Sequence, residues 1–401
     1  MRSIVRIAAL AVTVGVMAAC SAAPGGGLPA GAGSDDGNPA AAPTFVLPSN
    51  VKRACPESAD PSVAHCLGLV RIDAGGGPSN SGYVPGDIQA AYNLPSSTQG
   101  AGQTVAIVDA YDDPKAAKDL AQYRASFGLP ACNAANSCFR KVNQDGQRGH
   151  YPSPDPGWAL EVALDSDMVS AVCPNCNILL VEAKNPSPDN LGKAVDEAVK
   201  LGATVINNSY IGYGFKGTRL EKYYDHAGTI VVASGGDQGY GIGEPAGLPM
   251  VVAVGGTRLV RAKNDRGWNE TVWIGTGSGC ERKLPKPLWQ TDKRCGGRTM
   301  NDVAAVADPA HGVAVFDTYR EKGWIEMGGT SAASPIVAGI YGLAGNASSL
   351  DAAESLYAPG AALWDVTSGG NGLCEKKYLC NGKPGYDGPT GNGTPNGVAA
   401  F

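Results

Sequence analysis

Two acidic residues of the chain combine a type and a spacing that suit acid–base chemistry. Glu161 and Asp165 stand four residues apart in a stretch, Gly157 to Val172 (GWALEVALDSDMVSAV), that is apolar nearly all round. This pattern predicts a buried helix with both carboxylates on one face, about one turn apart. Buried neighbouring carboxylates repel, which raises at least one pKa and favours a shared proton. The alternative is that this face meets solvent.

A second segment, Ala233 to Gly239 (ASGGDQG), follows an apolar run and holds a single acid, Asp237, among glycines. Glycines let the backbone approach a ligand closely and can aim one side chain at it. An ordinary Gly/Asp turn is the alternative, and from this segment alone it is the better interpretation.

A third segment, Gly328 to Pro335 (GGTSAASP), runs into a helical pattern at Ile336 to Leu343. It places Ser331 at the amino end of a buried helix, where the helix dipole and free N–H groups favour developing negative charge. A serine nucleophile and its oxyanion site would benefit from that position. A capping serine is the alternative, although a cap does not require so specific a string.

Short apolar, β-branched runs supply the elements that must position these three segments. Runs of this kind are typical of strands buried on both faces, and helical patterns between them predict an α/β fold with a doubly wound, mostly parallel sheet. In such sheets function lies at the carboxyl ends of the strands. The expected strands are 104–109, 177–182, 204–208, 229–233 and 250–254, with helices at 114–127 and 191–201.

The string Gly-Thr-Ser-x-x-x-Pro around Ser331 resembles the nucleophile segment of the subtilisin-like fold, which contains the subtilisins and the sedolisins, or serine-carboxyl peptidases. Subtilisins use a histidine in a His-Gly-Thr-His type of motif, and none of the four histidines has that context. Sedolisins carry Glu-x-x-x-Asp on a helix, which Glu161 and Asp165 match, and Ala-Ser-x-Gly-Asp-x-Gly, which residues 233–239 match. The three motifs occur in the family's order, and the resemblance covers roughly Tyr83 to the end.

The resemblance implies an endopeptidase that hydrolyses protein or peptide substrates. Glu161 would act as general base toward Ser331, and Asp165 would orient Glu161 and share its proton. Asp237 would fill the oxyanion hole, where it must be protonated to donate a hydrogen bond. We therefore expect activity to be best in acid.

Two other residues and one other functional class compete with this scheme. Asp109 ends a strand where subtilisins keep their triad aspartate, and we interpret it as structural. His150 is a rival base for a conventional serine protease, but its Pro-rich surroundings indicate a loop residue. A non-catalytic, envelope-tethered binding protein on the same scaffold is the alternative from another class.

The carboxyl-terminal region resembles the family's calcium site. Mixed carboxylate and carbonyl ligation by oxygen suits Ca²⁺. Lys383 stands where the family usually has glycine, and a Gly-rich terminal loop without an ion is the alternative. The implied ligands are the side chains of Asp365 and Asp387 and the carbonyl groups of Val366, Lys383 and Gly385.

The cysteine spacing favours export. Ten cysteines besides Cys20 fall into five local couples, and an even number in a secreted chain predicts disulfides. Cys173 and Cys176, as a Cys-x-x-Cys pair, also fit a redox or metal motif, although the scattered histidines offer no matching half of a zinc site. The expected couples are Cys55 with Cys66, Cys132 with Cys138, Cys173 with Cys176, Cys280 with Cys295, and Cys374 with Cys380.

The amino-terminal region divides into short parts. Residues 1–20 resemble an export signal with an apolar run too short to span a bilayer, and Met17 to Cys20 resembles a bacterial lipoprotein box, so plain secretion and lipid attachment at Cys20 both stay open. The Ala/Gly/Pro-rich composition of residues 21–50 predicts a flexible tether. We expect residues 51–82 to be a short extension or a prodomain remnant, since they are too few for the family's usual prodomain. We expect residues 83–401 to be the peptidase domain, including the carboxyl-terminal calcium-binding loop.

Composition limits the partners. The 401 residues are 43% hydrophobic and 17% charged, which is sufficient for a packed core. The formal charge of -5, without a long basic run, argues against nucleic acid or an anionic membrane as the main partner. We expect a monomer that is secreted or attached to the cell envelope, with any membrane contact made through a lipid on Cys20.

Overall fold

The computed structural model describes residues 45–58, 60–74, 76–215 and 217–401, which belong to one compact unit. The predicted signal segment, Cys20 and most of the predicted tether lie outside the described residues. Within the described part of the chain, no helix is long and apolar enough to cross a membrane.

A largely parallel sheet forms the centre of this unit, in the order β11-β10-β9-β7-β4-β6-β5, with β14 pairing with β10. Only the β10–β11 pair is antiparallel. The predicted strands are confirmed to within one or two residues, except that β10 continues well past its predicted end. The strands are β4 (Thr104–Ala110), β5 (Phe139–Asn143), β6 (Asn177–Ala183), β7 (Val205–Asn208), β9 (Ile230–Ser234), β10 (Val251–Arg261), β11 (Trp268–Val272) and β14 (Val303–Val306).

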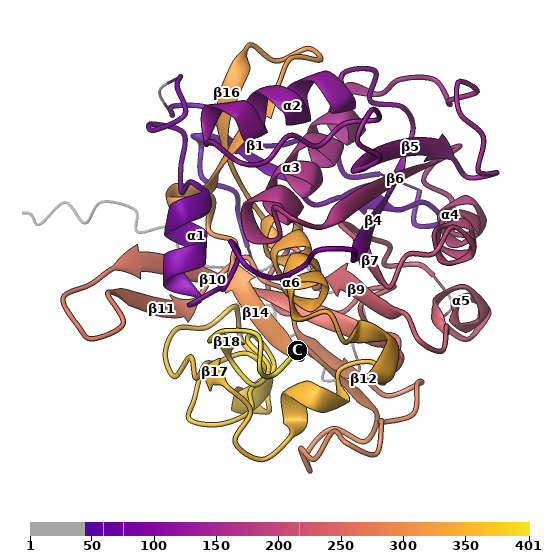
Figure 1. Ribbon diagram of the computed structural model, residues 1–401. Helices are drawn as coiled ribbons and strands as arrows, with labels where there is room; N and C mark the ends of the chain where they lie inside the picture. The colour runs from indigo at the N-terminus through magenta and orange to yellow at the C-terminus, as the bar shows by residue number, and fades with distance from the viewer. Residues whose placement is uncertain (1–44, 59, 75, 216) are drawn as a thin grey trace, which may run out of the picture. The chain divides into compact units, whose positions relative to one another are not determined.

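Helices cover both faces of this sheet, which confirms the doubly wound α/β fold. Figure 1 shows α3 and α6 side by side near the centre, and α4 and α5 across the strands from them. Each face has its own cluster of buried apolar side chains. The helices are α1 (Pro85–Ala91), α2 (Ala116–Ser126), α3 (Pro156–Val172), α4 (Pro188–Lys200), α5 (Gly217–Tyr224) and α6 (Thr330–Ala344), with 3₁₀ turns at Pro309–His311, Ala347–Ser349, Glu354–Tyr357 and Lys377–Leu379.

A second, antiparallel sheet joins the amino-terminal extension to the body, in the order β1-β3-β16-β15. The extension supplies β1 and β3 as well as β2, which pairs with β8. The remaining strands are β1 (Val51–Arg53), β2 (His65–Cys66), β3 (Leu69–Arg71), β8 (Tyr210–Ile211), β12 (Gly279–Glu281), β13 (Arg298–Met300), β15 (Val313–Asp317), β16 (Gly323–Gly328), β17 (Leu363–Trp364) and β18 (Thr394–Pro395).

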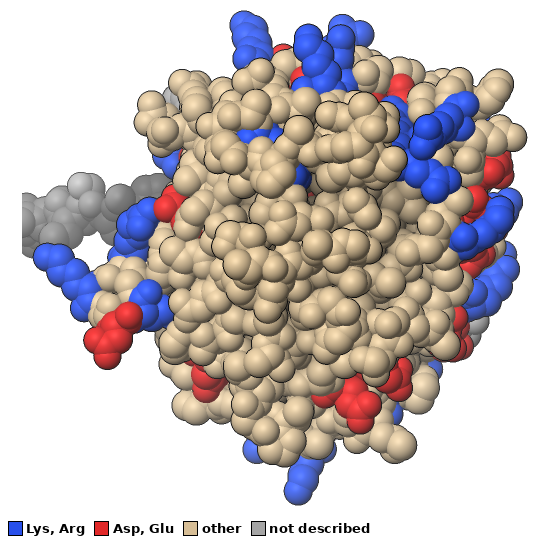
Figure 2. Space-filling model, in the orientation of Figure 1, with Lys and Arg blue, Asp and Glu red and all other residues tan. Residues whose placement is uncertain are grey.

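The predicted cysteine couples are all present as disulfides, Cys173 with Cys176 included. The face of the unit in Figure 2 is largely uncharged at its centre, with Lys and Arg side chains gathered toward its margins. That face carries no basic stripe of the kind that follows a nucleic acid backbone.

Candidate active site

Helix α3 brings two carboxylates into the interior. Asp155 caps its amino end by accepting hydrogen bonds from the backbone N–H groups of Gly157 (2.9 Å) and Trp158 (3.0 Å), and Pro156 occupies the first turn. The side chains of Glu161 and Asp165 are both 0% exposed. The predicted buried helix is therefore confirmed, and the alternative of a solvent-facing acidic face is wrong.

Asp165 is held by polar groups at the carboxyl end of β7. Its Oδ2 accepts a hydrogen bond from Asn207 Nδ2 (2.6 Å), and its Oδ1 accepts one from Ser209 Oγ (2.7 Å). Asn207 also donates to Ser209 Oγ (2.9 Å) and accepts from Ser334 Oγ (2.6 Å). This buried network fixes the Asp165 carboxylate relative to both β7 and α6.

The sequence analysis missed the side chains of that network. Their signal is visible in the run Asn207-Asn208-Ser209, where polar residues follow apolar ones at the end of a buried strand. A buried amide or hydroxyl needs hydrogen-bond partners, so polar residues at that position indicate a neighbouring polar side chain. The sequence could not show that the neighbour is Asp165, because α3 and β7 are distant in the chain.

Ser331 lies in the first turn of α6, in a segment whose backbone requires glycine. Gly329 precedes the helix with a positive φ of 92°, and a methyl group there would lie only 2.1 Å from the Leu67 carbonyl oxygen. Ser331 Oγ donates to the Ser209 carbonyl oxygen at 3.2 Å. Burial raises the pKa of the Glu161 carboxyl well above its usual value, and hydrogen bonding with the Ser331 hydroxyl offsets part of that rise.

Two groups therefore compete for the Ser331 hydroxyl. Glu161 Oε2 accepts from the Gly68 N–H at 2.8 Å, whereas its Oε1 has no hydrogen-bond partner in this geometry. The arrangement places a serine hydroxyl beside a buried carboxyl group.

Asp237 lies directly in front of the amino end of α6. Its Oδ1 accepts hydrogen bonds from the Thr330 backbone N–H (2.8 Å) and Oγ1 (2.7 Å). Its Oδ2 is buried and has no hydrogen-bond partner. The tight turn after β9 that carries it passes through Gly236, at a positive φ of 109°. Asp237 is thus directed at the amino end of α6, although the segment alone favoured an ordinary Gly/Asp turn.

Burial dominates the electrostatics of all these acids. It raises the pKa of Asp237 to about 7, and with the neighbouring negative charge of Asp109 it holds the pKa of Glu161 and of Asp165 well above their usual range. Glu161 further raises the pKa of Asp165. The cluster therefore retains protons in weak acid.

Asp109, interpreted from the sequence as structural, lies beside this pair at the end of β4. Both of its carboxyl oxygens are buried without a hydrogen-bond partner, and burial raises its pKa to about 8. The side chain therefore forms a third carboxyl of the cluster. His150, the rival base, is exposed in the loop that precedes α3, and its carbonyl oxygen accepts from Asn143 Nδ2 (2.9 Å).

The predicted calcium ligands gather in one carboxyl-terminal loop. Asp365 Oδ2 accepts from the Gly385 N–H and Asp387 Oδ2 from the Lys383 N–H, each at 2.9 Å. Val366 follows Asp365 directly and is buried. Burial raises the pKa of Asp387 to about 7. No group of three or more His, Cys, Asp or Glu side chains that could hold a metal ion occurs in the described ranges, so a cation here depends on backbone oxygens.

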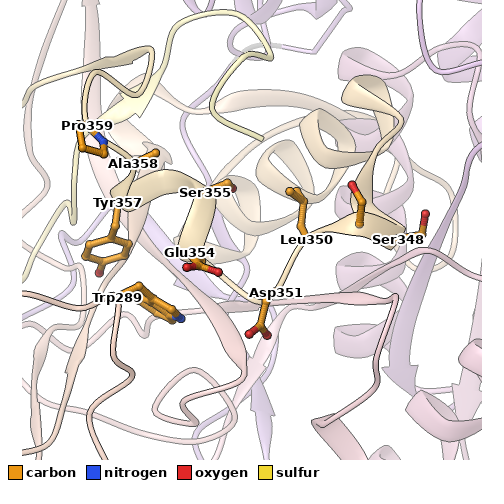
Figure 3. A pocket seen from close by; sticks show the side chains of 10 residues that line it. Trp289, Ser348, Leu350, Asp351, Glu354, Ser355, Tyr357, Ala358 and Pro359 are labelled. Carbon is orange, nitrogen blue, oxygen red and sulfur yellow. The ribbon is translucent and has the colours of Figure 1, made fainter.

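A separate pocket of about 690 Å³ lies at the other end of α6 (Figure 3). Figure 3 shows Asp351 and Glu354 beside Trp289 at its wall. Since α6 rises about 1.5 Å per residue, this pocket lies roughly 20 Å from Ser331. It contains none of the residues of the carboxylate cluster and is not the candidate active site.

The fold and these side chains define a class of protein. A parallel doubly wound sheet, a serine at the start of a buried central helix and an acid in front of that helix form a subtilisin-like scaffold, and two further buried carboxyl groups lie on the neighbouring helix α3. Residues 156–357 match the sequence profile of the subtilase family, peptidase S8.

Two curated relatives and one solved structure refine this class. Kumamolisin of Bacillus sp. (strain MN-32) is 31% identical, over 79% of this chain and 62% of its own. Sedolisin of Pseudomonas sp. (strain 101) is 27% identical, over 78% of this chain and 60% of its own. A structure of Pseudomonas sedolisin, a serine-carboxyl proteinase complexed with two molecules of pseudo-iodotyrostatin, superposes with a TM-score of 0.67 at 26% identity, over 79% of this chain and 96% of that chain.

The chain belongs to the subtilase family, and within it to the sedolisins. It spans about three fifths of the length of each curated relative named above.

Proposed function

We propose that the chain is an exported serine-carboxyl endopeptidase that hydrolyses peptide bonds of protein substrates in acid. The observation that carries this proposal is the burial of Glu161 and Asp165 beside Ser331, with Asp237 in front of the same helix. A scaffold without catalysis gains nothing from neighbouring carboxylates held away from water, because their charged forms are destabilised there.

Glu161 accepts the Ser331 proton in this proposal as the hydroxyl attacks the substrate carbonyl carbon. Asp165, fixed through Asn207 and Ser209, shares the proton of Glu161 and keeps its carboxylate oriented toward the nucleophile. A raised pKa makes the ionised form of Glu161 a stronger base, so the proton that the pair shares must reside on Asp165 when Ser331 attacks. Glu161 then donates the proton it has taken from Ser331 to the leaving nitrogen. The same group thus serves as base and then as acid.

Asp237 stabilises the oxyanion of the tetrahedral intermediate. With Oδ1 occupied by Thr330, the buried and unpaired Oδ2 is the position for a proton that can be donated to the developing charge. A pKa of about 7 keeps that proton in place through the acid range. Activity is therefore expected in acid and is lost as Asp237 ionises.

Calcium binding at the carboxyl-terminal loop is part of the proposal. The side chains of Asp365 and Asp387 accept hydrogen bonds from backbone N–H groups of residues 383–387, so both carboxylates lie beside the segment whose carbonyl groups would complete the oxygen ligation that Ca²⁺ prefers. Lys383 directs its ammonium group to the Pro384 carbonyl oxygen (3.1 Å). The ion would stabilise the charged form of the buried Asp387 carboxyl and the fold of the loop.

Localisation follows from the amino-terminal signal and the disulfides. Five disulfides within the described residues fit an oxidising compartment outside the cytosol. We propose that the enzyme is secreted or attached to the cell envelope, with lipid on Cys20 as the mode of attachment, and that it acts as a monomer.

The test is hydrolysis of denatured haemoglobin from pH 3 to 8 by the wild type, Ser331→Ala and Ser166→Ala. Ser166 is a matched control, since it is also a buried serine and its hydroxyl has no hydrogen-bond partner. We expect the wild type and Ser166→Ala to cleave in acid and Ser331→Ala to be inactive. An inert wild type, with and without calcium, would instead favour the envelope-tethered binding protein.

A further inference from the structure

A short stretch of backbone supports the turn that carries Asp237. We define the oxyanion turn as residues 235–241 (GGDQGYG) and the support segment as residues 275–278 (GTGS). Main-chain hydrogen bonds join the two on both sides of Asp237. They run from the Gly277 N–H to the Gly236 carbonyl oxygen (2.7 Å), from the Gly239 N–H to that of Gly275 (2.8 Å), and in both directions between Gly241 and Ser278 (2.9 and 3.0 Å).

The support segment and the oxyanion turn contact each other with no side chain between them. A methyl group on Gly277 would lie 2.0 Å from the Gly235 carbonyl oxygen and 3.3 Å from the Gly236 Cα atom. Backbones packed this closely leave no free space to absorb a displacement. A shift of the support segment therefore moves the turn, and with it the side chain of Asp237.

Asn301, which is 0% exposed, ties the support segment to the carboxyl-terminal part of the chain. Its Nδ2 donates to the carbonyl oxygens of Gly277 (2.8 Å), Pro389 (3.1 Å) and Gly388 (3.2 Å). Its own N–H also donates to the Gly388 carbonyl oxygen at 2.6 Å. Since three backbone acceptors converge on one nitrogen, this position requires a donor such as an amide.

Asn371 binds the neighbouring residues of the support segment in the same way. It is also 0% exposed, and its Nδ2 donates to the Thr276 carbonyl oxygen (2.6 Å) and to Ser278 Oγ (2.7 Å). Ser278 Oγ in turn donates to the Leu379 carbonyl oxygen at 2.6 Å. The Asn371 carbonyl oxygen accepts from the Tyr240 N–H at 2.9 Å, so this residue contacts the oxyanion turn directly as well.

The two side-chain amides act as donors alone. The amide oxygens of Asn301 and Asn371 are buried and have no hydrogen-bond partner among the described residues. The Asn301 oxygen lies against Gly235, where an added methyl group would be 2.3 Å from it. An unpaired buried oxygen costs stability, so the contribution of each side chain lies in its N–H groups. Those groups hold the backbone of the support segment against the turn.

We propose that Asn301 and Asn371 are positioning residues for peptide hydrolysis, which keep Asp237 directed at the oxyanion by fixing the support segment. This inference rests on the proposed peptidase function and on the role of Asp237 in it. The hydrogen bonds of both amide nitrogens end on the backbone and on Ser278, so the two residues act through the turn and not on the substrate. Because the oxyanion forms only as the reaction proceeds, a displaced Asp237 lowers kcat and leaves KM nearly unchanged.

The test is a double-mutant cycle on the full chain, with kcat and KM measured at pH 4 for one peptide substrate. Asn301→Ala and Asn371→Ala should each lower kcat about 10- to 100-fold and change KM less than about twofold. Combined with Asp237→Ala, which leaves no group to position, either change should lower kcat less than about threefold further. Asn143→Ala is the matched control and should keep the wild-type kcat, because this buried amide also donates to a backbone carbonyl, that of His150 (2.9 Å).

Equal losses of kcat with and without Asp237 would overturn the inference, since a purely structural contribution acts on both backgrounds alike. An unchanged kcat in both amide variants, or an Asn143→Ala enzyme as slow as they are, would overturn it too. Circular dichroism and thermal unfolding check each variant, and either amide alone can carry the test; failure of both variants to fold would assign the amides to the fold instead. An inert wild type would remove the proposed function along with the inference, whereas an active wild type with unaffected variants would remove the inference alone.

Discussion

The proton on Asp237 is the feature of the site whose removal has the most specific consequence. Asp237→Asn should keep the fold, because the amide oxygen can accept the two Thr330 hydrogen bonds that Asp237 Oδ1 accepts now. The amide nitrogen would replace Oδ2, which has no partner at present, and it donates at every pH. Asp237→Ala removes the donor altogether.

The expected magnitudes follow from the pKa of about 7. In the wild type, the fraction of protonated Asp237 falls about tenfold for each pH unit above 7, and the rate should fall with it. Asp237→Asn should lose this decline, so its kcat/KM relative to the wild type rises about tenfold per unit above pH 7. Asp237→Ala should be about 100- to 1000-fold slower in acid.

The assay is kcat/KM for one peptide substrate between pH 3 and 9, normalised to the protein concentration. Dividing the kcat/KM of Asp237→Asn by that of the wild type at each pH cancels the titration of Glu161, because both proteins share it. A ratio that stays flat from pH 5 to 9 would refute the proposed role of the proton. So would an Asp237→Asn enzyme as slow in acid as Asp237→Ala.

Three further outcomes are expected. Burial raises the folded-state pKa of Asp109 to about 8, so its contribution to stability is fully present below the unfolded pKa near 4 and is lost as the pH rises toward 8. In thermal unfolding, Asp109→Asn should reduce this fall in the free energy of unfolding by up to about 1.4 kcal/mol per pH unit. The variant should keep its activity in acid within a few fold of the wild type. A loss of more than 100-fold at pH 4 would instead make Asp109 part of the catalytic relay. Asn207→Ala should lower the free energy of unfolding by about 1–3 kcal/mol in urea titration and reduce kcat more than it raises KM, because Asp165 loses a buried donor; an unchanged kcat would contradict that positioning role. Chelation of calcium with EDTA should lower the melting temperature of the wild type, and Asp387→Asn should abolish this change. An equal change in melting temperature in the wild type and in Asp387→Asn would contradict the proposed ligands.

The fold was predictable because its strands are buried on both faces. Runs such as Thr104–Ala110 and Asn177–Ala183 are apolar on both faces for most of their length, and that pattern arises mainly in a parallel sheet covered by helices. The amino-terminal strands were not predictable. Val51–Arg53 and His65–Cys66 are too short to show a period, and partners distant in the chain determine their pairing.

The candidate site was predictable where chemistry requires a specific residue type. Glu161 and Ser331 lie in strings that serve few other purposes, so the sequence indicated them, whereas Asp237 was indicated only by the family resemblance that its segment completes. Asn207 and Gly68 were missed because any polar side chain or flexible residue could occupy their positions. Only the structure shows that one donates to Asp165 and that the other donates to Glu161.

The central claim is that a carboxylate, and not a histidine, activates Ser331. The most direct test compares kcat/KM at pH 4 for the wild type, Glu161→Gln and His150→Ala, since glutamine keeps the shape of the side chain and cannot accept the proton. We predict that Glu161→Gln falls about 100- to 10,000-fold and that His150→Ala equals the wild type. An active Glu161→Gln enzyme together with an inactive His150→Ala enzyme would contradict the carboxylate mechanism.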